Sequence, residues 1–319
     1  MNVINKKSFS KQQWLYASDN QLIIFDTSWS KEGLPCFNVI ATLNANNAFQ
    51  NASTHADWVA KHISGKLNIL IANSLFQLLM IDVPNVPPEE IDDAINLKAA
   101  DLIPYDLEEA ALDLIHLPSE AHRGRMRMAY LIATQKQPLS HWLEELIQRG
   151  IQVEIIDVEI TQLRNLAVYH QTLNQSGILH LQPNQSRLLL NFNGEMVLNR
   201  VFDTGLQKLT DNQTVLDGEL EVTVDSNQHQ NIPFESLVLE IRRSFDYYES
   251  QLALGAISEI YVLCDEKYQS LCTSLANKLG VRFHLMRPQD FMQINTAETD
   301  SNPVAHYNLI GTLYREALQ

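Results

Sequence analysis

A three-stranded meander that occurs twice is the feature that most constrains the fold of this chain. Runs rich in β-branched and aromatic residues cover 14–18, 22–28 and 37–43, and a similar set begins about 165 residues later. Tight turns are predicted at Asp19-Asn20 in the first set and at Asn193-Gly194 in the second, since short dipeptides of this kind close hairpins. Because helix and strand patterns alternate after each set, the repetition predicts a duplicated α/β architecture.

The first half of the chain predicts a lobe over residues 1–173, with an inserted subdomain at about 84–135. We expect Ser53 or Thr54 to cap its first helix, and a later helix to run from Pro88 to about Leu102 or Ile103. Asp157 and Glu159 flank the end of a buried strand and are predicted to cap the next helix. Further elements are predicted at 67–72, 76–83, 111–117, 126–134, 139–148, 153–158 and 160–173.

The second half predicts a lobe over residues 174–319. Residues 208–231 are polar and are predicted to form a small excursion with a short strand at 220–224. A terminal helix is expected at 304–318, and it would pack back on the first lobe. Further elements are predicted at 177–181, 187–192, 196–201, 234–254, 257–263, 268–279 and 281–285.

Composition narrows the classes of function. A length of 319 residues is typical of two domains. The chain has 23 basic and 38 acidic residues, and the resulting net charge of −15 disfavours binding to nucleic acid or to anionic lipid. No apolar run approaches the length of a membrane span. Cys36, Cys264 and Cys272 are odd in number and have no metal-binding spacing, so we expect reduced core cysteines and no zinc site.

Four blocks of sequence resemble the PilM family of type IV pilus assembly proteins, and most closely its branch that serves the MSHA pilus. The first block is VPNVPPEEI at 83–91, which continues to AADLIPY at 99–105. The second is GIQVEIIDVE at 150–159, the third is LEIRRSFDYY at 239–248, and the fourth is AHYNLIGTLYR at 305–315. Their order and spacing fit the family across nearly the whole chain.

The resemblance implies an actin-like ATPase fold, in which two ribonuclease-H-like lobes flank a cleft and the first lobe carries an inserted subdomain. It also implies a non-enzymatic scaffold that binds the cytoplasmic tail of a PilN-like membrane protein and contacts the pilus motor and platform proteins. Such a protein would be cytoplasmic and peripheral to the inner membrane. The tail would bind beside the inserted subdomain, where rigid apolar contacts are offered by Pro84, Pro87, Leu102, Ile103 and Tyr105.

Three turns test whether such a cleft could hold a nucleotide, because phosphates need glycine-rich turns with free backbone N–H groups. The first turn carries Asp19 and Asn20 without a glycine. The second carries Gln182 and Asn184 without a carboxylate, and the third carries Cys264 and Asp265 where glycines would be needed. We therefore expect a degenerate ATPase with no catalytic residue, no metal and no cofactor.

Two alternatives stay open. One is an ATP-binding switch in the same machine, in which the cleft binds nucleotide weakly. The other is a component of a type II secretion system similar to the GspL family. Members of that family usually carry their own membrane span and a periplasmic domain, which this sequence lacks, so we expect the pilus protein.

Overall fold

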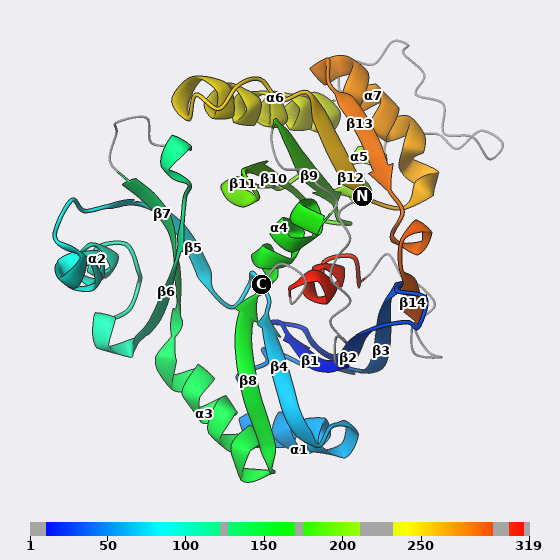
Figure 1. Cartoon of the computed structure of the whole chain (residues 1–319). Coiled ribbons are helices and arrows are strands. Elements are labelled where there is room, and N and C mark those ends of the chain that lie inside the picture. The colour runs from blue at the N-terminus through cyan, green and yellow to red at the C-terminus, as the bar shows by residue number, and fades with distance from the viewer. Residues whose placement is uncertain (1–10, 122–126, 170–174, 211–231, 296–305, 316–319) are drawn as a thin grey trace. The chain divides into compact units, whose positions relative to one another are not determined.

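The computed structural model describes residues 11–121, 127–169, 175–210, 232–295 and 306–315 (Figure 1). The chain divides into two compact units. Unit 1 comprises Met1–Leu117, Gly124–Asn165 and Phe291–Gln319, and unit 2 comprises Pro118–Arg123 and Leu166–Asp290. The predicted lobe boundary at 173/174 and the strand predicted at 220–224 lie outside the described residues.

Unit 1 is built on a six-stranded sheet in the order β14-β3-β2-β1-β4-β8. The antiparallel meander β1-β2-β3 is confirmed, and β4 and β8 add parallel to its β1 edge. Trp14 and Phe25 stack within this sheet, and both are fully buried. The strands are β1 (Gln12–Ala17), β2 (Gln21–Trp29), β3 (Pro35–Asn44), β4 (Gly65–Ile71), β8 (Ile151–Val158) and β14 (Gln293–Asn295).

Two helices of unit 1, α1 (Ala52–His62) and α3 (Lys136–Gln148), pack together beside β4 and β8 (Figure 1). Arg149 joins them, because its guanidinium lies 2.6 Å from Asp57 and 2.7 Å from Glu145. The predicted cap of α1 is wrong by two or three residues: Asn51 takes the N-cap position in the left-handed conformation and makes no side-chain cap.

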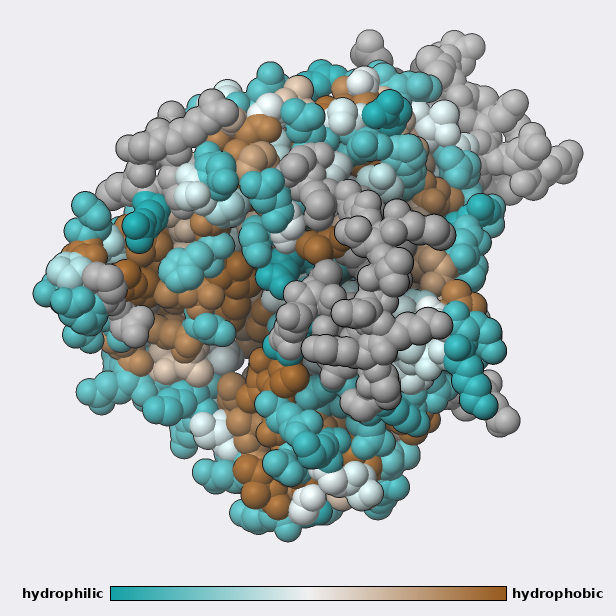
Figure 2. All heavy atoms as spheres, in the orientation of Figure 1, coloured by the Kyte–Doolittle hydropathy of each residue, from teal (hydrophilic) through white to brown (hydrophobic). Residues whose placement is uncertain are grey.

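A separate three-stranded antiparallel sheet, in the order β5-β7-β6, follows β4 in unit 1. One face packs on α2 through Ile81, Ile95, Ala99 and Leu131. Figure 2 shows hydrophobic residues gathered over this sheet. The helix predicted from Pro88 is shorter than expected, since a 3₁₀ turn precedes α2 and α2 ends at Ala100. The elements are β5 (Gln77–Val83), η1 (Pro88–Glu90), α2 (Ile91–Ala100), η2 (Leu107–Glu109), β6 (Ala110–His116) and β7 (Arg127–Gln135).

The unit 2 sheet, β11-β10-β9-β12-β13, repeats the order of the five strands β3-β2-β1-β4-β8 of unit 1, so the predicted duplication is confirmed. Asn193 and Gly194 both have positive φ, as a two-residue hairpin turn requires. The predicted helix 234–254 begins as α6 but widens into a π-helical turn, η4, at Tyr247. The strands are β9 (Ser176–Leu181), β10 (Ser186–Phe192), β11 (Glu195–Phe202), β12 (Glu259–Leu263) and β13 (Arg282–Met286).

The helices of unit 2 enclose its hydrophobic core on one face of the sheet. Leu237 and Ile241 from α6 and Leu275 from α7 meet Leu188 and Val262 of the strands there. The short η3 (Ser119–Ala121), which follows β6, also belongs to this unit, and its Ala121 lies in the same core. The helices are α5 (Leu206–Thr210), α6 (Ile232–Asp246), η4 (Tyr247–Gln251), η5 (Glu266–Tyr268), α7 (Gln269–Leu279) and η6 (Pro288–Asp290).

The remaining elements are a helix that follows β8 and a short 3₁₀ helix near residue 310. Helix α4 (Glu159–Tyr169) begins in unit 1 directly after β8. The terminal helix predicted at 304–318 differs from the structure, in which residues 306–315 contain only a short 3₁₀ helix, η8 (Ile310–Tyr314). The other residues of 304–318 are not among the described residues. Among the described residues, no helix combines the length and the apolarity that crossing a membrane requires.

Candidate functional site

The first predicted cleft turn, between β1 and β2, has its backbone donors occupied by its own side chain. The Ser18 hydroxyl accepts hydrogen bonds from the N–H groups of Asn20 and Gln21, at 3.3 and 3.0 Å. Asp19 accepts a hydrogen bond from the Ser74 hydroxyl at 2.9 Å. A phosphate at this turn would have to displace the Ser18 hydroxyl from these two amides.

A buried carboxylate lies at the same end of the unit 1 sheet, where β1, β4 and β8 terminate. Glu159 accepts hydrogen bonds from Asn73 N at 3.0 Å, Asn308 Nδ2 at 2.9 Å and Tyr16 OH at 3.3 Å. Burial and the Glu159 charge raise the pKa of Tyr16 far above its ordinary value. Glu159 therefore ties three separate segments to the start of α4, instead of capping its own helix as we expected.

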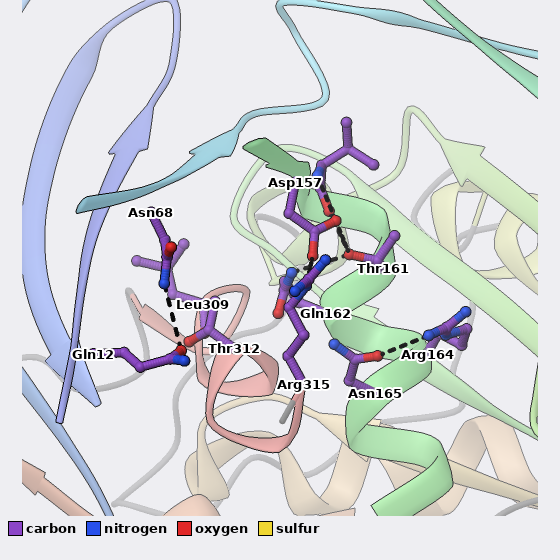
Figure 3. Close-up of polar contacts among 11 residues, drawn as sticks. Gln12, Asn68, Asp157, Thr161, Gln162, Arg164, Asn165, Leu309, Thr312 and Arg315 are labelled. Atoms are coloured by element: carbon purple, nitrogen blue, oxygen red, sulfur yellow. Dashed lines mark hydrogen bonds and ion pairs between the residues drawn. The ribbon is translucent and has the colours of Figure 1, made fainter. Parts of the chain in front are cut away.

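Asp157 likewise binds a distant segment, which Figure 3 shows. Its carboxylate accepts the Thr161 hydroxyl at 2.8 Å and pairs with the Arg315 guanidinium at 2.8 Å. Close beside this pair, Gly311 packs on α4 so tightly that an added Cβ would lie 2.0 Å from the carbonyl oxygen of Gln162. The second and fourth sequence blocks thus meet in unit 1 through polar contacts, and the fourth block also approaches the backbone of α4 closely.

The second predicted turn, between β9 and β10 in unit 2, is closed by the segment that leads into α5. The N–H groups of Leu206 and Gln207 donate to the carbonyl oxygens of Gln182 and Pro183, each at 2.9 Å. The Gln182 and Gln185 side chains also bind each other at 3.0 Å. An added Cβ on Gly205 would lie 2.3 Å from the carbonyl carbon of Asn184, so the turn is covered by backbone.

The third predicted turn follows β12 in unit 2. Asp265 caps η5, because its carboxylate accepts the Lys267 N–H at 3.1 Å and lies 3.3 Å from the Lys267 ammonium. Cys264 points into the core instead, with its sulfur 3.6 Å from that of Cys272 on α7. All three cysteines are free thiols, and Cys36 is only half-buried, so its predicted core position is wrong.

The six predicted cleft residues are thus divided between the units, with Asp19 and Asn20 in unit 1 and the other four in unit 2. In the first and third turns, backbone amides already bind a side chain of the turn, and in the second turn two carbonyl oxygens accept N–H groups from the segment that leads into α5. Within the part of the chain that the structure describes, no three side chains of metal-ligating type come together. His180 lies buried in β9, where burial and the neighbouring Arg187 lower its pKa to about 3, so its imidazole is neutral at physiological pH.

The five residues predicted to bind a partner lie on both sides of α2, and the structure distributes them unevenly. Pro87 and Leu102 are exposed, Pro84 is half-buried and Ile103 is buried. Tyr105 lines a pocket of about 460 Å³ in unit 1. The aromatic and apolar part of this pocket is formed by Phe49, Leu75, Phe76, Tyr105, Ala133 and Pro138, and its polar part by Asn47, Gln50, Ser74, Gln77, Thr134 and Gln135.

Two residues that line this pocket each carry a buried polar atom with unused hydrogen-bonding capacity. Within the described residues, the buried Gln77 Oε1 and Tyr105 OH have no hydrogen-bond partner, and burial raises the pKa of Tyr105. Such buried groups cost free energy until a partner satisfies them. Only Tyr105 of this pocket was predicted from sequence; its other walls come from β5, β7, α3 and two loops that are distant from Tyr105 in the chain.

Comparison with known proteins defines the fold. No model of a protein family matches the sequence, and no curated protein matches it. A chain of a solved PilM-PilN type IV pilus biogenesis complex is 17% identical over 96% of both chains, with a TM-score of 0.60. The chain therefore has the actin-like ATPase fold that we predicted, with two α/β units that share an order of five strands.

Two other solved structures are similar with lower scores. The cytoplasmic domain of EpsL, an inner membrane component of the type II secretion system of Vibrio cholerae, is 11% identical over 95% of both chains, with a TM-score of 0.46. A Bacteroides thetaiotaomicron protein with an actin-like ATPase fold is 10% identical, with a TM-score of 0.47, and the match covers 92% of the present chain and 96% of the other.

Proposed function

We propose that this chain is a non-catalytic component of a type IV pilus assembly platform, in which it holds a cytoplasmic segment of a PilN-like inner-membrane protein. The observation that carries the proposal is the pocket at Tyr105, which joins apolar walls to two unsatisfied polar atoms. The likeness to the PilM-PilN complex supports the choice of machine. The four sequence blocks further support the MSHA branch, whose member is usually called MshI, and a location at the inner membrane through that partner.

The pocket suits an inserted peptide segment. Its aromatic and aliphatic walls would take an apolar side chain, while Gln77 Oε1 would accept a peptide N–H and the Tyr105 hydroxyl would bind a peptide carbonyl. Satisfying a buried polar group recovers about 1–3 kcal/mol. The two orphaned atoms therefore favour a ligand that supplies both a donor and an acceptor, as a polypeptide backbone does.

Removal of the Tyr105 ring is expected to weaken tail binding. We expect the full chain to bind a synthetic peptide of the partner's cytoplasmic tail with a Kd on the order of tens of micromolar, and Tyr105→Ala to weaken it about tenfold, which is about 1.4 kcal/mol. Tyr105→Phe should have a smaller effect, because it removes only the hydroxyl. Fluorescence anisotropy with a labelled tail peptide measures both changes.

Tyr261 provides the matched control, since it is a half-buried tyrosine of unit 2 that stacks on His284 at 5.0 Å. Tyr261→Ala should leave the affinity for the tail unchanged. The proposal is contradicted if the tail does not bind, or if Tyr261→Ala weakens binding as much as Tyr105→Ala does.

The non-catalytic part of the proposal predicts that Mg·ATP does not bind. It is supported by the three turns, where Ser18 and Asp265 bind turn amides and the turn at Gln182 is covered by backbone. Titration calorimetry of the full chain with Mg·ATP at millimolar concentration should show only the heat of dilution. A binding isotherm that disappears in Asp19→Ala or Asp265→Ala would instead support the ATP-binding switch.

A further inference from the structure

Helix α2 and its flanks present a surface that is distinct from the Tyr105 pocket. Residues 84–110 contain eight acidic residues and one lysine, so their net charge of −7 is almost half of the −15 of the whole chain. Around α2 the surface in Figure 2 is mostly hydrophilic, with hydrophobic residues among it. We call it the α2 face, and define it by exposed residues: Glu89, Glu90, Asp93, Leu97, Asp101, Leu102, Asp106, Glu108 and Glu109.

Two leucines of the α2 face point away from the core. Ile95 and Ala99 bury the inner side of α2 against the three-stranded sheet. Leu97 is 75% exposed and Leu102 is 48% exposed, although they lie within five residues of each other. Single exposed leucines are ordinary, but these two lie among acidic residues, and neither belongs to the core that α2 forms with the three-stranded sheet.

The acidic residues of the α2 face have no ion-pair partner among the described residues. The nearest cation in sequence, Lys98, donates instead to the carbonyl oxygen of Asp82 at 2.8 Å. Some exposed acids elsewhere in the chain do have an ion-pair partner, as Glu235 has in Lys278 and Asp290 has in Arg287. Uncompensated like charges repel one another, so a cationic partner would lower the free energy of this face.

We propose that the α2 face binds the basic cytoplasmic flank of a membrane-spanning helix, in which lysine or arginine side chains surround one or two apolar side chains. The acidic residues of the α2 face favour a cationic partner, and the exposed Leu97 and Leu102 favour a partner that also carries apolar side chains. Cytoplasmic flanks of membrane helices have an excess of Lys and Arg, which fits this requirement. A second copy of this chain, at −15, and an anionic lipid surface would both be repelled.

This inference rests on the proposed function for the source of the basic segment, but it uses other residues than the pocket. The proposed function and the present inference can therefore fail separately. If a tail peptide binds at Tyr105 and nothing binds at the α2 face, the proposed function stands and the present inference fails. The converse result, binding at the α2 face without binding at the pocket, leaves only the present inference.

The experiment uses two fluorescein-labelled peptides, one that intersperses lysine pairs with single leucines and one with serine in place of each leucine. Anisotropy measured on the full chain should show tighter binding of the leucine peptide. Leu97→Ser combined with Leu102→Ser should weaken that binding about fivefold. Glu108→Lys combined with Glu109→Lys should weaken it about tenfold and reduce its dependence on salt.

Unit 2 offers matched controls for both variants. Ile232 and Leu239 are 58% and 47% exposed on α6, so Ile232→Ser with Leu239→Ser repeats the loss of two exposed apolar side chains. Asp246→Lys with Glu249→Lys repeats the charge reversal on exposed acids. Both controls, and Tyr105→Ala, should leave the affinity for the leucine peptide unchanged.

The inference is overturned by any of three results. The serine peptide could bind as tightly as the leucine peptide, which would mean that the α2 face attracts cations by charge alone and does not recognise apolar side chains. The unit 2 controls could weaken binding as much as the α2 variants. The α2 variants could change the sedimentation of the protein alone, which would make a second copy the occupant.

Discussion

Replacing Gly311 with alanine is expected to lower the free energy of unfolding of unit 1 by about 3 kcal/mol. The new Cβ would lie 2.0, 2.6 and 2.8 Å from the carbonyl oxygen, carbonyl carbon and Cα of Gln162. These are backbone atoms of α4, so no side-chain rotation can relieve the overlap. Either α4 or the segment 306–315 has to move, and movement would break the contacts of Arg315 with Asp157 and of Asn308 with Glu159.

Urea unfolding followed by tryptophan fluorescence measures this change selectively, because Trp14, Trp29, Trp58 and Trp142, the four tryptophans of the chain, all lie in unit 1. Trp29 also contacts Tyr314, with ring centroids 6.3 Å apart, so it reports on the segment that carries Gly311.

Gly33→Ala is the control for Gly311→Ala. An added Cβ at Gly33 meets nothing within 4 Å, but its φ of 82° strains an L-residue by about 1–2 kcal/mol. The Gly311 variant should therefore be clearly less stable than the Gly33 variant. Equal stability of the two would contradict the close approach of this segment to α4.

Glu159→Ala should destabilise unit 1 by about 3 kcal/mol, because it leaves the buried hydroxyl of Tyr16, the amide of Asn308 and the N–H of Asn73 without their acceptor. Glu159→Gln should cost less, since the amide oxygen still accepts hydrogen bonds. The same tryptophan-monitored unfolding measures both variants.

Glu154→Ala is the matched control for Glu159→Ala, since Glu154 pairs with Lys66 on the exposed edge of the sheet and such pairs contribute little. The result also bears on chemistry at this end of the sheet. A carboxylate that holds three segments together is not free to activate water, whereas unchanged stability of Glu159→Ala would mean that this group is available for another task.

Most of the secondary structure of this chain could be predicted, because it depends on sequence patterns that span only a few residues. Buried strands such as β4 and β9 are apolar runs of strand length with turn residues at their ends, and Gly280 ends α7 in the left-handed conformation as a helix-terminating glycine does. The exceptions have local reasons. Residues 293–295 are too short to carry a strand pattern, and β14 exists only because β3 provides its hydrogen bonds.

The candidate sites were predicted less completely than the fold. Tyr105 was singled out from the sequence because it belongs to a recognisable block, but Gln77, which lines the same pocket, lies at the start of an ordinary strand. Glu159 had one available signal, since polar residues directly after a buried parallel strand gather at one edge of a sheet. Its role as an acceptor could not be predicted, because its partners Tyr16 and Asn308 are 143 and 149 residues away.

The amino-acid sequence by itself determined the repeated meander, the alternation of helices and strands, and the absence of glycine from the first turn, because these depend on neighbours a few residues apart. Only the tertiary structure decided that amides of the first and third turns are already bound, that Gly311 touches α4, and that the acids of the α2 face have no ion-pair partner among the described residues. These properties depend on which distant segments contact one another. The topology of the fold determines those contacts, and local sequence propensity does not.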